Sequence, residues 1–225
     1  MTDPVDEFQS QRYQMVRQQI RARGVMDKAV LKAMFMTPRH RFVDDSQAQF
    51  AYADNPLPIG FGQTISQPYI VAYMVEAAQI SPTDKVLEIG TGCGYEAAVL
   101  SQLANVVYTV EIIPKLAEGA RQRLSQLGYA NVHVKIGNGY QGWVEHAPYN
   151  AILVTAAPPK IPQALIEQLA IKGRLIIPVG TWLQDLMVIT KTENGLLKQI
   201  TIPVRFVPMT GKRFPKVAAE EDRDR

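Results

Sequence analysis

The chain has 225 residues, of which 47% are hydrophobic, and a formal net charge of +3. This length suits one large domain or a core with an appended subdomain. So small a net charge argues against a dedicated nucleic-acid-binding protein, which usually gathers Lys and Arg on one face. The single cysteine, Cys93, excludes an internal disulfide and is typical of a reducing compartment. Residues 1–7 are polar and acidic, and no run approaches 18 uncharged apolar residues. We therefore expect no signal peptide, no membrane span and a cytoplasmic location.

The first 80 residues are predicted to form a helical extension. Residues 8–23 have the spacing of an amphipathic helix, and Asp27 is placed to cap a second helix that ends before Pro38. Residues 37–64 show no regular period and are rich in Pro and Gly, which in a compact domain usually indicates a functional or a disordered segment. Their apolar side chains favour a packed segment. A third helix is predicted to begin at Ser66-Gln67-Pro68.

From Lys85 onward, apolar strand patterns alternate with helical ones. Strands are predicted at 85–90, 106–111, 132–136, 150–156 and 173–179, and helices at 95–103, 114–127 and 162–170. This alternation predicts a parallel sheet with right-handed crossovers. Two more strand patterns, 186–190 and 197–208, flank Asn194-Gly195, which is a strong hairpin signal.

We therefore predict an α/β fold with a doubly wound, mostly parallel, Rossmann-like sheet and an antiparallel C-terminal strand pair. The expected organisation is an N-terminal helical extension at residues 1–80 that packs on the core and carries a substrate loop at about residues 52–66. A core at 81–210 and a charged, mobile tail at 211–225 are expected to follow.

The first predicted strand of the core runs into a glycine-rich turn, in which Glu88 is followed by Gly90, Gly92 and Gly94. Glycine lets the backbone press close to a ligand, and the helix that follows presents its free N–H groups there. Glu111, at the end of the next strand, is placed to accept hydrogen bonds from both ribose hydroxyls of a nucleoside. Together these residues predict a nucleoside-cofactor site at the carboxyl ends of parallel strands.

The glycine spacing narrows the class of cofactor. A dinucleotide fingerprint needs a glycine at its sixth position, where this chain has Tyr95, and a phosphate-binding loop needs a Gly-Lys-Ser/Thr ending that is absent. The pattern acid-x-Gly-x-Gly-x-Gly resembles the first motif of S-adenosyl-L-methionine (AdoMet) methyltransferases. A tight turn without a ligand is the alternative. Asn138, between Gly137 and Gly139, is placed either to bind the adenine or only to form a turn.

The expected nucleophile follows from what the chain lacks. Small apolar residues, Ala156 and Ala157, follow the fourth core strand, where many nitrogen methyltransferases carry an Asn/Asp-Pro-Pro-aromatic motif. The three histidines, His40, His133 and His146, are scattered, and no cluster has metal-ligand spacing, so neither a histidine base nor a metal site is predicted. A substrate carboxylate, with a pKa of about 3.5–4, needs no base.

An ionised nucleophile needs orientation by a few neutral donors. Thr64 and Ser66 offer hydroxyl groups in a loop immediately before a predicted helix. Ser66 is equally suited to be the N-cap of that helix, and the residues alone leave both roles open.

Five segments closely resemble those of the protein-L-isoaspartate O-methyltransferases. They are Pro56–Tyr69, Leu87–Tyr95, Val154–Ala157, Arg174–Gly180 and Val204–Pro208. The likeness runs from about residue 10 to about residue 210. The first segment is specific to this family, whereas the glycine turn is general to methyltransferases.

The resemblance implies roles for particular residues. It assigns the active site to Ser66, and it implies no metal. Substrate binding is expected at Pro58, Ile59, Thr64, Ser66 and Val207, and cofactor binding at Glu88, Gly90, Gly92, Gly94, Glu111, Asn138, Gly139, Thr64 and Thr210. The chain departs from the family's usual residues at Cys93, Glu96, Asn138 and Asn150, where Ser, Gln, Asp and Asp are usual.

The activity that the resemblance implies is methyl transfer from AdoMet to the free α-carboxylate of L-isoaspartyl residues in damaged proteins. The products are S-adenosyl-L-homocysteine and a methyl ester that cyclises to a succinimide. Expected partners are isoaspartyl peptides and proteins, and neither a nucleic acid nor a membrane is expected. The enzyme is expected to be a monomer, with an oligomer as the alternative. Two alternatives are a methyltransferase for another carboxylic acid and an AdoMet-binding module without chemistry. Retention of the whole segment 56–69 argues against the second alternative.

Overall fold

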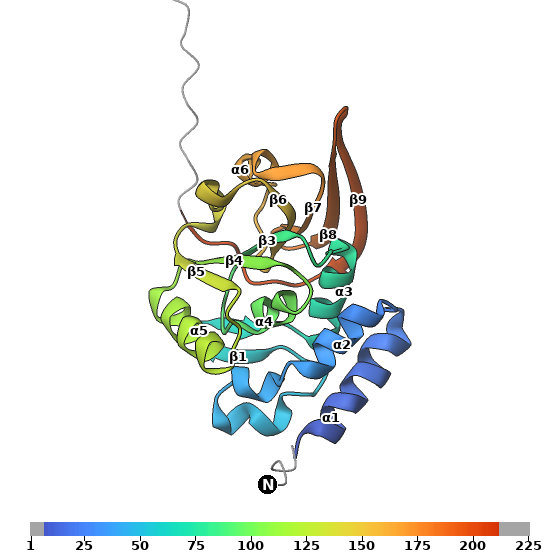
Figure 1. The fold of residues 1–225 in the computed structure, drawn as a ribbon, viewed down its shortest axis with the longest axis vertical. Helices are drawn as coiled ribbons and strands as arrows, with labels where there is room; N and C mark the ends of the chain where they lie inside the picture. Colours follow the sequence, from blue (N-terminus) through green and yellow to red (C-terminus); the bar gives the residue numbers. More distant parts are fainter. Residues whose placement is uncertain (1–6, 212–225) are drawn as a thin grey trace, which may run out of the picture.

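A computed structural model describes residues 7–211 as a seven-stranded sheet with helices on both faces (Figure 1). In spatial order the strands are β5 (Val132–Ile136), β4 (Val106–Glu111), β3 (Lys85–Ile89), β6 (Tyr149–Val154), β7 (Leu169–Gly180), β8 (Gln184–Thr192) and β9 (Gly195–Val204). Neighbours from β5 to β7 are parallel, whereas the β7–β8 and β8–β9 pairs are antiparallel. The predicted fold class, including the antiparallel strands at the C-terminal end, is confirmed.

Helical segments precede the sheet and also connect its strands. The N-terminal ones are α1 (Gln9–Gln14), the π-helical η1 (Met15–Ile20), η2 (Arg21–Arg23), α2 (Lys28–Met36), η3 (Arg39–Phe42), η4 (Asp45–Phe50) and α3 (Pro68–Ala78). The later ones are α4 (Tyr95–Ser101), α5 (Pro114–Gln126), η5 (Gly139–Gln141), η6 (Val144–His146) and α6 (Gln163–Glu167). A two-stranded antiparallel hairpin of β1 (Leu57–Gly60) and β2 (Gln63–Ile65) stands apart from the main sheet.

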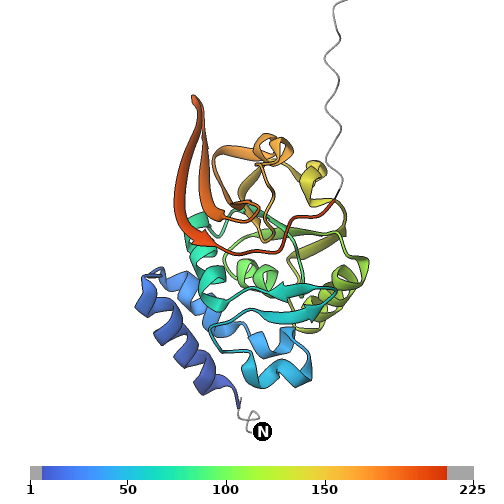
Figure 2. The ribbon, with the colours of Figure 1, turned by 180° about the vertical axis from the view of Figure 1, so that it is seen from behind.

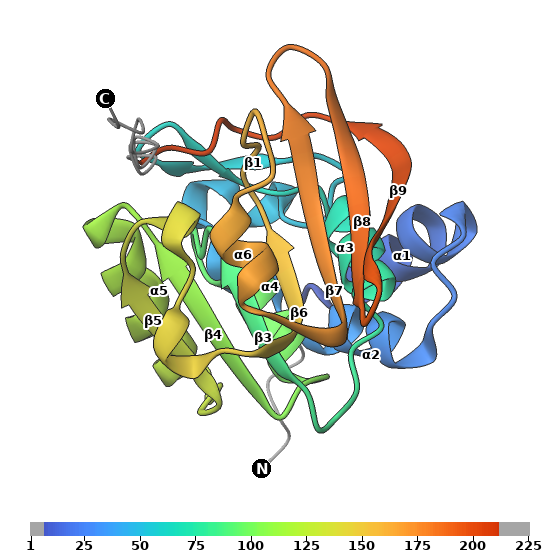
Figure 3. The ribbon, with the colours of Figure 1, turned by 90° about the horizontal axis from the view of Figure 1, so that it is seen from above.

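Two buried cores explain why the central strands are apolar at nearly every position. On β3, Val86 belongs to the core shared with α3, α4 and α5, whereas Leu87 and Ile89 belong to the core shared with α6. Successive side chains of a strand point to opposite faces, so a strand covered on both faces must be apolar on both. The view along the layers shows α6 on one side of the sheet and α4 and α5 on the other (Figure 3).

The strand order reverses direction at β3, whose neighbours are β4 on one side and β6 on the other. Ligands of open α/β sheets bind in the crevice at such a switch point, outside the carboxyl ends of the strands. The segment after β9 returns to this edge, where Pro208 forms a parallel bridge with Ala157. Seen from behind, the segment after β9 runs across the molecule directly above the β1–β2 hairpin (Figure 2).

The division predicted near residue 80 lies between α3 and β3, and it stays a prediction. On the N-terminal side of this point, α3 packs on β6 and β7 of the sheet. The charged tail predicted at 211–225 lies, apart from Gly211, outside the described residues. Among residues 7–211, no helix is long and apolar enough to cross a membrane.

Candidate active site

The glycine turn after β3 is fixed against the end of β6. The Thr155 hydroxyl donates to the carbonyl oxygens of Ile89 at 3.1 Å and of Gly90 at 2.8 Å. Gly90 has a φ of +98°, and a Cβ atom there would lie 2.3 Å from the Thr155 hydroxyl oxygen. Only glycine fits this position, both by backbone conformation and by space. The turn is therefore pressed onto the switch point of the sheet.

Glu111 holds the same turn from the other side. Its carboxylate is buried and accepts hydrogen bonds from the backbone N–H of Gly92 at 2.8 Å and of Ile113 at 2.9 Å. Each carboxylate oxygen has a further lone pair, so two more donors can be accepted. This is the capacity that a pair of ribose hydroxyls requires.

A small cavity of about 60 Å³ lies between these elements. Its lining includes the predicted residues Ile59, Thr64, Gly90, Gly92, Glu111, Gly139, Val207 and Thr210. At Gly139 a Cβ atom would lie 2.4 Å from Ile89 Cγ2, so the backbone there is also in close contact with its neighbour. Glycine cradles and a buried acid suit a nucleoside, and these residues fit AdoMet. This cavity by itself is smaller than the roughly 300–1,000 Å³ of typical small-molecule sites.

Three predicted cofactor residues lie outside this lining. Glu88 is fully buried beneath the turn, where it accepts a hydrogen bond from the Thr109 hydroxyl. Burial, reinforced by the neighbouring Glu96, raises the pKa of Glu88 well above its usual range. Gly94 packs against Leu124 at the start of α4. The Asn138 Oδ1 atom accepts the backbone N–H of Tyr140, and so caps η5. Contact of these three residues with a cofactor stays a prediction.

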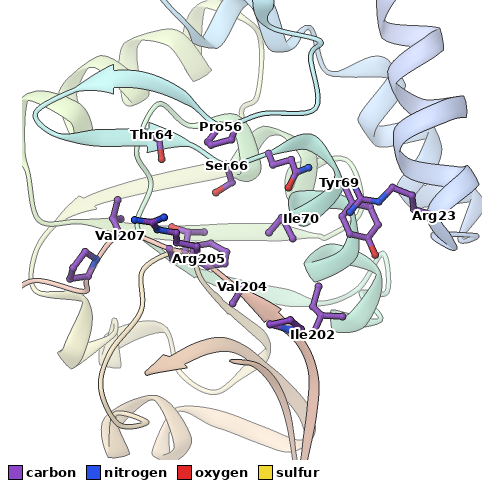
Figure 4. A pocket seen from close by; sticks show the side chains of 15 residues that line it. Arg23, Pro56, Thr64, Ser66, Tyr69, Ile70, Ile202, Val204, Arg205 and Val207 are labelled. Atoms are coloured by element: carbon purple, nitrogen blue, oxygen red, sulfur yellow. The ribbon is translucent and has the colours of Figure 1, made fainter. Parts of the chain in front are cut away.

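A larger cavity of about 900 Å³ adjoins the small one, and Figure 4 shows the side chains that line it. It is lined by Arg23, Pro56, Thr64, Ser66, Gln67, Tyr69, Ile70, Thr155 and the segment Ile202–Pro208. The two cavities share Thr64, Thr155, Val207 and Pro208 in their linings, so they meet at these residues. A substrate in the large cavity therefore has direct access to a ligand in the small one.

Ser66 lines the large cavity and is not a helix cap. The N-cap of α3 is Gln67, Pro68 occupies the first turn, and no side chain caps the helix. Within residues 7–211 the Ser66 hydroxyl makes no hydrogen bond, and Figure 4 shows it pointing into the cavity. The alternative role as an N-cap is wrong, because the helix begins one residue later than the sequence pattern suggests.

The hairpin presents its residues alternately. Ile59 lines the small cavity, whereas Pro58 is exposed and lines neither cavity. Adjacent residues of a strand point to opposite sides, so only one of this pair can face the site. Substrate binding by Pro58 stays a prediction that its position does not support.

The structure also brings together residues that the sequence did not single out. The Arg23 guanidinium lies 3.5 Å from the centre of the Tyr69 ring and donates to Asp54 at 2.8 Å, while Arg205 is exposed at the same cavity. Arg23 lies 46 residues before Tyr69, and no local pattern signals such a distant contact. Thr155 was equally missed, because its role depends on the neighbouring strand.

No histidine or thiol stands ready as a base at the two cavities. His40 contacts the Tyr52 hydroxyl at 2.7 Å, and His133 and His146 stack on Tyr108; none of them lines either cavity. Burial raises the pKa of the Cys93 thiol. In residues 7–211 no group of three His, Cys, Asp or Glu side chains is placed to hold a metal ion.

A doubly wound sheet with a glycine turn and a buried acid at its switch point is typical of Rossmann-like proteins that bind a nucleoside cofactor. The glycine spacing, with Tyr95 at the sixth position, favours the AdoMet-dependent methyltransferases among them. Residues 10–214 match the model of the protein-L-isoaspartate(D-aspartate) O-methyltransferase family. The chain belongs to this family, as the resemblance in the sequence predicted. Its activity is accordingly AdoMet-dependent methylation of L-isoaspartyl residues in proteins.

Relatives of known name agree with the family match. A protein-L-isoaspartate O-methyltransferase from Picosynechococcus is 62% identical over 203 residues, covering 90% of this chain and 91% of the relative. A protein of the same name from Gloeobacter violaceus is 59% identical over 201 residues, covering 88% of this chain and 98% of the relative.

Among solved structures, a protein-L-isoaspartate O-methyltransferase superposes with a TM-score of 0.82 at 30% identity, covering 89% of this chain and 66% of that one. A second solved structure is that of a Plasmodium falciparum protein, described as a putative enzyme of the same kind in complex with S-adenosyl-L-homocysteine. It has a TM-score of 0.76 and 24% identity, covering 88% of this chain and 98% of that one. The second likeness supports the fold alone.

Proposed function

We propose that this chain methylates the free α-carboxylate of L-isoaspartyl residues at the junction of its two cavities. The observation that carries the proposal is the shared lining at Thr64, Thr155 and Val207, with the unbonded Ser66 hydroxyl beside it. When bound, AdoMet supplies the sulfonium methyl group that the carboxylate attacks, leaving S-adenosyl-L-homocysteine. The resulting ester cyclises to a succinimide, whose hydrolysis yields some normal aspartate.

The small cavity is the proposed AdoMet site. Glu111 accepts the ribose hydroxyls while it keeps the turn in place through Gly92 and Ile113. Gly90 and Gly139 allow close approach of the backbone. Asn138 is proposed to reach the adenine from the start of η5.

Orientation, not proton transfer, is the proposed contribution of the large cavity. A carboxylate with a pKa of about 3.5–4 is ionised at neutral pH and needs no base. The Ser66 hydroxyl donates a hydrogen bond to one carboxylate oxygen, and this leaves the other oxygen free to attack. Arg205 gives the lining a positive charge that suits an anionic substrate, whereas the charge of Arg23 is offset by its ion pair with Asp54 at 2.8 Å.

The substrate chain is proposed to lie extended between the β1–β2 hairpin and the segment Ile202–Pro208. Contacts to backbone groups tolerate different flanking sequences, which a repair enzyme requires. We further propose that the enzyme acts as a monomer in the cytoplasm and does not bind nucleic acid. The near-neutral net charge of +3 supports the last point.

The function is tested with pairs of peptides that differ only in an isoaspartyl or an aspartyl linkage. Methyl transfer from labelled AdoMet is expected to the isoaspartyl member alone. Equal labelling of both members, or labelling of a small carboxylic acid in preference to either, would contradict the proposal.

The role of Ser66 is tested by Ser66→Ala and Ser66→Asp. We expect Ser66→Asp to lower kcat/KM on an isoaspartyl peptide by more than about a hundredfold, roughly 2.7 kcal/mol, because the new carboxylate repels that of the substrate. Ser66→Ala, which only removes the donor, is expected to cost about tenfold. The melting temperature should stay unchanged in both, since the hydroxyl caps nothing.

Ser125→Asp, which adds the same charge on the exposed face of α5, is the matched control and should retain full activity. Near-normal kcat/KM for Ser66→Asp would remove Ser66 from the mechanism and move the search to Thr64.

A further inference from the structure

The turn between β7 and β8 carries two large apolar side chains in full contact with solvent. Trp182 is 98% exposed and Leu183 is 90% exposed. The chain's other tryptophan, Trp143, is half-buried and packs against Tyr108 and His146. Single exposed apolar residues are ordinary on protein surfaces, but two adjacent ones of this size at a loop tip typify a contact surface.

This turn is anchored to the rim of the large cavity by Gln184. The side-chain amide of Gln184 is buried; it donates to the backbone carbonyl of Phe206 at 3.1 Å and to that of Thr181 at 3.4 Å. Its carbonyl oxygen accepts the backbone N–H of Phe206 at 2.7 Å. Phe206 lines the large cavity, so one side chain ties the apolar turn to the cavity wall.

The backbone of the turn is itself fixed. Gly180 has a φ of +138°, and a Cβ atom there would lie 1.9 Å from the carbonyl oxygen of Leu183. The N–H of Gly180 donates to the carbonyl of Pro158, at the carboxyl edge of the sheet. Figure 3 shows the turn rising at this edge, next to the segment that follows β9. Trp182 and Leu183 are thus presented on a rigid support beside the site.

We propose that Trp182 and Leu183 form a docking surface for an apolar side chain of the substrate polypeptide, outside the isoaspartyl residue itself. The proposal rests on the proposed function, because it assigns the occupant of this turn from its continuity with the substrate cavity. An extended chain advances about 3.3–3.6 Å per residue, so a segment leaving the cavity past Phe206 reaches the turn within a few residues. Damaged, unfolded proteins expose the apolar residues that such a surface binds.

The size of the surface favours a passing substrate over a second copy of this chain. A buried tryptophan covers about 150–250 Å². A stable protein interface buries about 800 Å² on each partner. Two side chains at a loop tip fall short of that area, whereas a weak contact that adds to a substrate already held in the cavity needs no more.

The test uses the double variant Trp182→Ser/Leu183→Ser and two kinds of substrate. One is a short isoaspartyl peptide flanked only by Gly and Ala. The other is a set of longer peptides in which one Phe is moved stepwise away from the isoaspartyl residue on either side. We expect Phe at one spacing to raise the wild-type kcat/KM by about tenfold through KM, and the double variant to lose this gain. The variant should act on the short peptide at the wild-type rate.

Leu197→Ser/Ile200→Ser is the matched control, since Leu197 and Ile200 are exposed apolar residues of β9 that lie outside the lining of the large cavity. It should keep the full gain from Phe. If wild type gains nothing from Phe at any spacing, or if the control loses the gain equally, the docking surface is refuted. Sedimentation that shows a wild-type dimer, converted to a monomer by the double variant with unchanged kinetics, also refutes it. Absence of methylation of the short peptide by wild type would instead refute the proposed function.

Discussion

The two cavities of this enzyme are built in opposite ways. The small one is formed around a short stretch of chain, the glycine turn after β3, and is tightened by Glu111 and Thr155 from the two neighbouring strands. The large one is formed where the β1–β2 hairpin and α3 meet the segment Ile202–Pro208, which lies more than 120 residues further along the chain. The first is close-packed, whereas the second holds about 900 Å³.

The difference follows what each cavity must recognise if the small one binds AdoMet and the large one binds the substrate, as proposed above. AdoMet is always the same molecule, so its site can be specified by glycines and fixed acceptors. The substrate is any chain with one kind of damage, so its site needs width and a few polar groups. Substitutions in the small cavity should therefore act through steric fit and hydrogen bonds.

Gly90→Ala should have the largest effect. Its Cβ atom meets the Thr155 hydroxyl at 2.3 Å and forces a φ of +98° on a residue with a side chain. We expect AdoMet affinity, measured by calorimetry, to fall by more than about a hundredfold, or 2.7 kcal/mol. Gly128→Ala is the control, because Gly128 has a φ of +80° with nothing within 4 Å of its Cβ position.

Gly128→Ala should cost about 1 kcal/mol of stability from backbone strain and leave AdoMet affinity unchanged. Adding Thr155→Ala to Gly90→Ala removes the clashing hydroxyl and should restore part of the affinity. Equal affinities for Gly90→Ala and wild type would show that the small cavity is more adaptable than its geometry implies.

Glu111→Gln should have an intermediate effect. The amide keeps the size of the side chain and one accepting oxygen, but its NH₂ group accepts neither a backbone N–H nor a ribose hydroxyl, so the hydrogen bond from either Gly92 or Ile113 is lost. We expect AdoMet affinity to fall about thirtyfold, near 2 kcal/mol. To separate ribose binding from support of the turn, the affinities of wild type and Glu111→Gln are also compared for an AdoMet analogue that lacks the ribose hydroxyls. If the penalty stays the same on this analogue, Glu111 supports the turn and does not bind the ribose.

Glu96→Gln should show the smallest effect, and it concerns stability. Burial raises the pKa of Glu96 to about 8 from an ordinary value of 4.5. Between these values the folded protein holds a proton that the unfolded chain releases, so stability is lost as pH rises from about 4.5 to about 8. Between pH 6 and pH 7 this group alone should cost the folded protein about 1 kcal/mol of stability. Glu96→Gln should remove this loss of stability. In urea unfolding at pH 6 and pH 7, the free energy of unfolding of the variant should therefore rise relative to that of wild type as the pH increases. Parallel curves for the two proteins would contradict the shifted pKa.

The parallel core was predictable because its signals are local. Each strand is an apolar run covered on both faces, and each helix follows at short spacing. Asp27 caps α2 as predicted, since its Oδ1 atom accepts from Ala29 at 2.7 Å and Val30 at 3.0 Å. The boundaries between α6 and β7 were wrong: the helix ends at Glu167 and the strand begins at Leu169. Leu169 pairs with Tyr149 across an irregular register, which a sequence period cannot reveal.

Residues 37–64 show what local patterns cannot give. They contain η3, η4 and the β1–β2 hairpin, whose turn at Gly60, Phe61 and Gly62 has positive φ at all three residues. The strands are too short for an alternating pattern to stand out, and Pro58 argues for an irregular segment. Among the residues that line the small cavity, the glycines and Glu111 were predicted from spacing alone. Arg23 and Thr155 were not, because their roles exist only once distant segments meet.

The placement of Ile202–Pro208 also sets when activity can first arise during synthesis. Chains leave the ribosome N-terminus first, and folding proceeds in that order. A nascent chain that already contains the glycine turn and Ser66 still lacks one wall of each cavity, because Val207 and Pro208 line both. If the proposed sites are right, methylation must therefore wait until Val207 and Pro208 have been synthesised, and a nascent fragment that ends before them should be inactive.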